Sequence, residues 1–118
     1  MVKIMIMDNK TLFKKVIDDV ENRIEQKEDR IIVVDSIDAF RKLFTNERLR
    51  LLTVVKKTKP DSIYQLAKTL QRDLKSVQSD AKFLQSLGLL ELNEYKEGLR
   101  IKLRPVVKAK NIQLEMAL

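Results

Sequence analysis

The chain has 118 residues and a formal net charge of +7, enough length for one compact domain with a modest core. Cysteine and histidine are both absent, which excludes disulfides, a thiol nucleophile, a histidine base and cysteine or histidine metal sites. Because Gly88 and Gly98 are the only glycines, no phosphate-cradling or dinucleotide-binding loop can be built, and we expect no enzyme activity, no cofactor and no metal.

The first forty residues predict a β-α-β unit. Apolar side chains alternate along Val2–Met7, which is typical of a short strand, and Asp8-Asn9 offers a cap for a helix from about Lys10 to Lys27. The β-branched run Ile31–Val34 predicts a second strand that is covered on both faces. If the two strands share a sheet, the helix between them makes them parallel.

Two capped helices are expected next. Ser36 can cap a short helix that carries Ile37, Phe40, Leu43 and Phe44, and Thr45 can cap a helix from Asn46 to about Lys57. The second helix has a wide apolar face, formed by Leu49, Leu51, Leu52, Val54 and Val55. A cluster of basic residues surrounds the two helices, and we expect some of its members to contact phosphates. This cluster comprises Arg41, Lys42, Arg48, Arg50, Lys56, Lys57 and Lys59.

Residues 62–88 predict a helix-turn-helix. Ser62 can cap the first helix, and Gln65 can bond back to that cap. The expected core face of this helix consists of Ile63, Leu66, Ala67 and Leu70. Asp73 can cap the second helix, which Gly88 ends. The second helix has apolar residues at helical spacing: Leu74, Val77, Ala81, Leu84 and Leu87.

Beyond Gly88 the apolar period changes to two, which predicts a two-stranded wing around a loop at 95–98. In the second strand Leu99, Ile101 and Leu103 alternate with basic residues, so its outward face is expected to be entirely basic. Apolar alternation over Ile112–Met116 predicts a last strand that pairs with the N-terminal strands of the same chain or of a second copy.

The predicted fold class is therefore α+β. A winged helix-turn-helix DNA-binding domain covers residues 37–104. Residues 1–36 form an N-terminal β-α-β support and dimerisation element, and residues 105–118 provide a C-terminal strand that packs on this element in a small additional sheet.

The positive charge is concentrated beyond residue 40. Residues 1–40 carry a net charge of −2 and residues 41–118 a net charge of +9, which suggests a nucleic-acid surface, although basic patches also bind acidic proteins and anionic membranes. In the second helix of the motif the polar side chains outside the apolar stripe can donate hydrogen bonds to phosphates or base edges. Such a face is often merely solvated, but its place in the motif favours DNA contact. The candidate DNA-binding residues are Arg72, Lys75, Ser76, Gln78, Ser79, Lys82, Lys96, Arg100 and Lys102.

Four segments, in their order and spacing, resemble a known family. Leu43–Leu52, Pro60–Ala67, Arg72–Asp80 and Leu84–Leu89 are similar to small MarR-like winged helix-turn-helix transcriptional regulators of archaea and bacteria, and the likeness covers nearly the whole chain. The resemblance implies sequence-specific binding of duplex DNA by a homodimer. Some members of the group are antitoxins, which would add a toxin or other protein as a partner. The resemblance also implies which residues face the DNA: Arg72, Lys75, Ser76, Gln78, Ser79 and Lys82.

The chain departs from that family pattern at two places. Ser76 and Ser79 stand where longer polar or basic side chains are frequent, which leaves the target sequence open. Gln71 replaces a glycine often found in the turn, which suggests that this turn forms without a left-handed residue.

We expect a cytoplasmic, sequence-specific DNA-binding regulator, a repressor or an antitoxin-like autoregulator. Membrane insertion is not expected, because the longest uncharged stretch, Phe83–Leu90, is too short to span a bilayer. The alternative is a winged-helix protein-interaction module whose basic strand binds an acidic partner, since the fold serves both roles. The outward face of residues 75–82 lacks the apolar anchor of an interface hot spot, which favours DNA.

Overall fold

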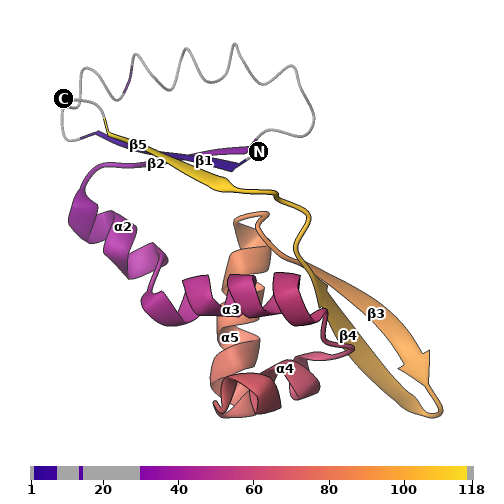
Figure 1. Ribbon diagram of the computed structural model, residues 1–118. Helices are drawn as coiled ribbons and strands as arrows, with labels where there is room; N and C mark the ends of the chain where they lie inside the picture. Colours follow the sequence, from indigo (N-terminus) through magenta and orange to yellow (C-terminus); the bar gives the residue numbers. More distant parts are fainter. Residues whose placement is uncertain (1, 8–13, 15–29, 117–118) are drawn as a thin grey trace. The chain divides into compact units, whose positions relative to one another are not determined.

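The computed structural model describes residues 2–7, 14 and 30–116 (Figure 1). The chain forms two compact units. The sheet unit comprises Met1–Phe44 with Ala109–Leu118, and the winged unit comprises Thr45–Lys108. The helix predicted from about Lys10 to Lys27 lies almost wholly outside the described residues. Among the helices that are described, none is long and apolar enough to cross a membrane.

The sheet unit contains a three-stranded parallel sheet. Its strands are β1 (Val2–Ile6), β2 (Arg30–Val34) and β5 (Ile112–Met116), in the order β2-β1-β5. Both neighbours run parallel to β1, so that Ile4 lies opposite Ile32 on one side and Leu114 on the other. The predicted parallel pairing is therefore confirmed, and the last strand pairs within the same chain.

Burial in this sheet follows the position of each strand. The central strand β1 buries Val2, Ile4 and Ile6, as its alternation predicts. The edge strand β2 is less covered than expected, because Ile31, Ile32 and Val33 are only half-buried. On the opposite edge, the exposed fractions of Leu114 and Met116 are 55% and 47%.

The helix α2 (Ile37–Leu43) belongs to the sheet unit. The Ala39 amide donates to Ser36 Oγ at 3.0 Å, which confirms the predicted cap. The rings of Phe40 and Phe44 stack with their centroids 5.3 Å apart, and Phe44 is buried. The aromatic pair thus anchors the C-terminal end of this short helix.

The winged unit packs three helices and a hairpin around one core. Its elements are α3 (Asn46–Thr58), α4 (Ile63–Leu70), α5 (Leu74–Ser86), β3 (Glu91–Glu97) and β4 (Arg100–Val106). Thr45, Ser62 and Asp73 each accept a hydrogen bond from a first-turn amide of the helix that they cap. Gln65 differs from the expected capping box, because its side chain accepts from the Asp61 amide instead of the cap residue's amide. The core is formed by Leu51, Leu52, Val55, Ile63, Leu66, Ala67, Leu70, Val77, Ala81, Leu84, Leu89 and Leu90.

The turn between α4 and α5 contains a left-handed residue. Gln71 has φ 55° and ψ 43°, and this geometry lets the Arg72 amide donate to the Ala67 carbonyl at 3.1 Å. The expectation that the turn forms without a left-handed residue is therefore wrong. The hydrogen bond that closes the end of α4 requires this backbone conformation even though no glycine is present.

The predicted end of α5 is confirmed, but the predicted burial of its first residue is not. Gly88, with φ 77°, donates to the Gln85 carbonyl, and Leu89 donates to the Leu84 carbonyl, which together make a Schellman cap. Leu74 is 38% exposed, so its assignment to the core stripe is wrong. Leu74 is the first residue of α5, and the helix buries only residues further along: Val77, Ala81 and Leu84.

The wing is an antiparallel hairpin whose register pairs Glu91 with Val106 and Glu97 with Arg100. The second strand does not bury its apolar residues as predicted, because Leu99 is fully exposed and Ile101 is 64% exposed. A two-stranded ribbon that extends beyond the helices has no core at its tip to cover them (Figure 1). Together the described elements form an α+β fold with a winged-helix-like arrangement.

Candidate nucleic-acid interface

One face of α5 gathers most of the candidate residues. Lys75, Gln78, Ser79 and Lys82 are exposed, and Ser76 is half-buried. Their spacing of three or four residues places Lys75, Gln78 or Ser79, and Lys82 in a row along the helix. The opposite side of α5 buries Val77, Ala81 and Leu84 in the core. The amphipathic pattern therefore fixes which side chains face outward.

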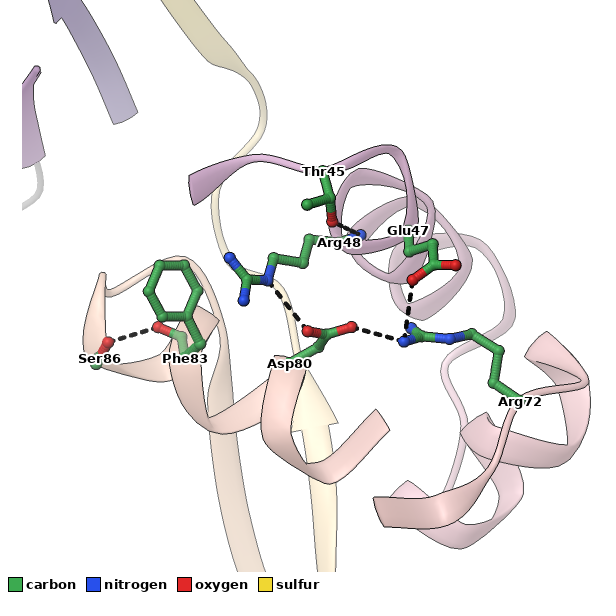
Figure 2. Close-up of polar contacts among 7 residues, drawn as sticks. All are labelled: Thr45, Glu47, Arg48, Arg72, Asp80, Phe83 and Ser86. Carbon is green, nitrogen blue, oxygen red and sulfur yellow. Dashed lines mark hydrogen bonds and ion pairs between the residues drawn. The ribbon is translucent and has the colours of Figure 1, made fainter. Parts of the chain in front are cut away.

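Asp80 is the one acidic residue in the sequence of α5, and it points away from the exposed face. Its side chain is 14% exposed and lies between two guanidinium groups (Figure 2). Arg48 Nε lies 3.1 Å from Asp80 Oδ1, and Arg72 Nη2 lies 2.9 Å from Asp80 Oδ2. The carboxylate charge is thus compensated inside the unit and does not add to the outward face.

Both arginines have a second partner. The Arg48 guanidinium lies 4.0 Å from the centroid of the Phe83 ring, and Arg72 Nη2 lies 3.3 Å from Glu47 Oε2. Among the described residues Arg72 Nη1 has no hydrogen-bond partner, although it is buried. Arg72 was predicted to face DNA, and the structure places its side chain, only 17% exposed, in this ion-pair network between α3 and α5.

The N-terminal turns of α3 and α5 border a shallow hollow of about 400 Å³. Polar side chains of the two helices and of the residues just before them line it: Thr45, Glu47, Arg48, Arg72, Lys75, Ser76, Ser79 and Asp80. Asp73 caps α5 beside the hollow, and the hydrogen bonds from Ser76 hold the pKa of the Asp73 carboxyl below its usual value. The hollow therefore joins the exposed face of α5 to the first turn of α3.

The wing contributes two separate sets of cations. Lys96 and Arg100 are exposed near its tip. Lys102 is half-buried, and its Nζ lies 2.7 Å from Glu97 Oε2. This hydrogen bond lowers the pKa of Glu97 and raises the pKa of Lys102. Of the three wing residues predicted to contact DNA, Lys102 is thus already engaged by a carboxylate.

A groove of about 540 Å³ between α4 and the wing was not foreseen from the sequence. Tyr95 donates from its hydroxyl to the Asp61 carbonyl at 2.7 Å, and the Arg104 guanidinium lies 4.8 Å from the Tyr95 ring centroid. On α4, Lys68 lies over the Tyr64 ring at 4.6 Å. Two basic side chains of β4, Lys102 and Arg104, therefore border this groove, so the strand does not have a uniformly outward basic face.

The outward face of α5 is rich in hydrogen-bond donors. The outward face of α5 offers ammonium, amide and hydroxyl donors, which suit phosphate oxygens and the acceptors of base edges. Among the described residues no group of three or more carboxylates could hold a metal ion.

A family model described as HVO_A0114 matches residues 43–114, which include the whole winged unit. Neither the curated proteins nor the solved structures gave a match to this chain. The match covers more than half of the sequence and spans α3, α4, α5 and the wing, the elements that build the candidate interface. The chain therefore belongs to the HVO_A0114 family.

Proposed function

We propose that the winged unit binds duplex DNA in a sequence-specific manner and that the protein regulates transcription, as a repressor or as an antitoxin-like autoregulator. One observation carries the proposal. The exposed face of α5 presents Lys75, Gln78 and Lys82, while Asp80, the one acid of the helix, is held inward by Arg48 and Arg72. A helix face without an exposed carboxylate suits the surface of a polyanion.

The dimensions of an α-helix support insertion of α5 in the major groove. A helix with its side chains is about 10–12 Å wide, and the major groove is about 12 Å wide. Gln78 lies in the middle of the exposed row, where its amide can bond N7 and N6 of an adenine. Lys75 lies in the first turn, where a phosphate would also be attracted by the helix dipole. In this arrangement Gln78 reads sequence and Lys75 positions the helix.

A dimer is part of the proposal. Strand β5 is an edge of its sheet, and Leu114 and Met116 are about half exposed on it. Edges of this kind pair readily with a second chain. Two-fold pairing would present two copies of α5 to half-sites about one helical turn apart. We also propose that the protein acts in the cytoplasm and that, in the antitoxin-like case, it binds a toxin or another protein.

A second candidate function is a module that binds an acidic protein. The exposed apolar side chains of Leu99 and Ile101 favour it, because a large exposed apolar patch marks a protein-interaction site. Two side chains, however, supply only a small part of the roughly 800 Å² that each partner buries in a stable interface. The row of donors on α5 favours DNA over this candidate.

The test is selection of bound fragments from a random duplex library, followed by binding isotherms on the selected and a scrambled duplex. We expect an enriched motif. Gln78→Ala should weaken binding to the selected site by about 1–3 kcal/mol and change binding to the scrambled duplex little, whereas Lys75→Ala should weaken both similarly. Asn111→Ala is the matched control, because Asn111 is an exposed amide side chain of the sheet unit that precedes strand β5.

Absence of any enriched motif would contradict sequence-specific binding. If a motif is enriched but Gln78→Ala leaves the ratio of the two affinities unchanged, another surface reads the sequence and α5 is not the reading helix.

A further inference from the structure

The tip of the wing exposes apolar side chains where a solvated turn would be expected to carry polar ones. Gly98 and Leu99 form a two-residue loop between the paired residues Glu97 and Arg100. Leu99 is fully exposed, and Ile101, two residues further along, is 64% exposed. Neither side chain contributes to the core of the winged unit, so both remain available to a binding partner.

The tip is also well defined. Gly98 has φ 64°, and a two-residue hairpin loop with glycine first is typical of a type II′ turn, which matches the twist of the strands. The Glu97–Lys102 ion pair links the strands beside the loop at 2.7 Å. Short paired strands on both sides of the loop therefore hold Leu99 at a fixed apex. A side chain held in this way can enter a narrow site at a small cost in conformational entropy.

Positive charge surrounds the exposed leucine. Arg100 follows it directly, and Lys96 lies opposite Ile101 in the hairpin; both cations are exposed. The nearest acid, Glu97, is compensated by Lys102, which also lowers the pKa of the Glu97 carboxyl. The tip thus combines one protruding apolar side chain with two flanking cations. A polyanion whose charged edges enclose an apolar interior complements this pattern, and the duplex minor groove has phosphates at its edges and stacked bases between them.

We propose that Leu99 is a wedge that enters the DNA minor groove and inserts between two base pairs, while Lys96 and Arg100 contact the phosphates on either side. This inference rests on the proposed function and extends it to a second groove. The minor groove is about 6 Å wide, and paired strands lie about 4.8 Å apart before their side chains are added. The ribbon is too wide to enter, but a single apex side chain fits.

Insertion of an apolar wedge unstacks a base step and kinks the duplex. Pyrimidine–purine steps unstack most readily, so the wing should favour a TA or CA step at a position that α5 does not contact. The selected binding sites should therefore show a second conserved element outside the bases read by Gln78.

The experiment places 2-aminopurine at successive adenines of the selected site and measures its fluorescence with wild type, Leu99→Ala and Leu99→Met. Wild type should raise the fluorescence at one step outside the major-groove contact. Leu99→Ala should abolish that rise and lower the affinity about tenfold, whereas Leu99→Met should keep both. Ile37→Ala is the control, because Ile37 is an exposed apolar residue of the sheet unit. Melting temperatures should be equal, since Leu99 is fully exposed.

The outcomes separate the two proposals. If wild type selects a motif but Leu99→Ala binds it with unchanged affinity and fluorescence, the wedge is wrong and DNA binding stands. If wild type selects no duplex at all, both are wrong. Sedimentation with vesicles of phosphatidylserine and phosphatidylcholine tests a membrane as the partner. Leu99-dependent binding to these vesicles, without any change in 2-aminopurine fluorescence, would overturn the wedge in favour of a lipid surface.

Discussion

Removal of the Asp80 charge should destabilise the winged unit substantially. Asp80→Asn keeps the size of the side chain but leaves the guanidinium groups of Arg48 and Arg72, at 3.1 and 2.9 Å, without their shared carboxylate. Exposed ion pairs contribute about 0–1 kcal/mol, and loss of one partner from a buried pair costs about 3–5 kcal/mol.

The side chains of Asp80, Arg72 and Arg48 are only 14–20% exposed, so water screens their charges weakly. Each arginine nevertheless keeps another contact, Arg48 with Phe83 and Arg72 with Glu47. We therefore expect the free energy of unfolding to fall by about 2–3 kcal/mol, equivalent to roughly 10 °C in melting temperature.

Urea denaturation followed by circular dichroism measures this change, provided that the dependence on urea concentration keeps its slope. Glu94→Gln is the control, because Glu94 is an exposed carboxylate of the wing and its loss should change stability by less than about 0.5 kcal/mol. If Asp80→Asn is no more destabilising than Glu94→Gln, the network does not hold α5 against α3. The two arginines would then not be what keeps the Asp80 charge off the exposed face of α5.

Three further predictions concern the turn, the wing and the assembly. Gln71→Gly should stabilise the protein by about 0.5–1 kcal/mol in thermal denaturation, because Gln71 has a left-handed backbone conformation that glycine adopts without strain. The control Gln85→Gly, in the right-handed helix α5, should cost about 1 kcal/mol. If Gln71→Gly is destabilised, the side chain of Gln71 contributes more to stability than its backbone strain removes. Arg100→Ala should reduce the slope of log affinity against log salt concentration by about 1. Lys102→Ala should reduce it by less, because Lys102 is already paired with Glu97, and equal slopes for the two variants would contradict this difference. Leu114→Asp should convert the expected dimer to monomers or insoluble protein, whereas a wild type that sediments as a monomer at micromolar concentration would refute the dimer.

Local rules explain why much of the fold could be predicted from sequence. The caps at Ser36, Thr45, Ser62 and Asp73 satisfy amides three residues away, so each helix start depends only on neighbouring residues. Strand alternation and the Gly88 cap are equally local. The face of α5 that carries most of the candidate site follows from the same periodicity, because the buried stripe determines which residues remain outside.

The arrangement around Asp80 could not be predicted in this way. Arg48 and Asp80 are 32 residues apart, and nothing in the spacing of the sequence distinguishes their contact from the many other arginine–carboxylate pairs available. Arg72 was expected at the DNA because it lies near the start of the second helix of the motif, at a position that the family resemblance implies to face DNA. Its direction depends on how α3 packs against α5, which only the tertiary structure defines.

The left-handed Gln71 shows a different limit. Its conformation is set by the hydrogen bond that ends α4, and a residue other than glycine adopts it at a cost of about 1–2 kcal/mol, which the packing of the unit must offset. Residue type is evidence for such a conformation when it is glycine. It is weak evidence against the conformation when it is not.

Alternation in the wing predicted the strands but not what their faces contact. A period of two says that Leu99, Ile101 and Leu103 share one side of a strand, and the usual inference is that this side is buried. That inference holds only where the helices cover the whole length of the strand. Here only the base of the ribbon meets the helices, so Pro105 is buried and Leu103 half-buried, while Ile101 and Leu99 extend beyond the core. The same geometry directs Lys102 and Arg104 toward the groove beside α4. An apolar residue that alternation would assign to the core is thus left at the tip, where only a binding partner can cover it.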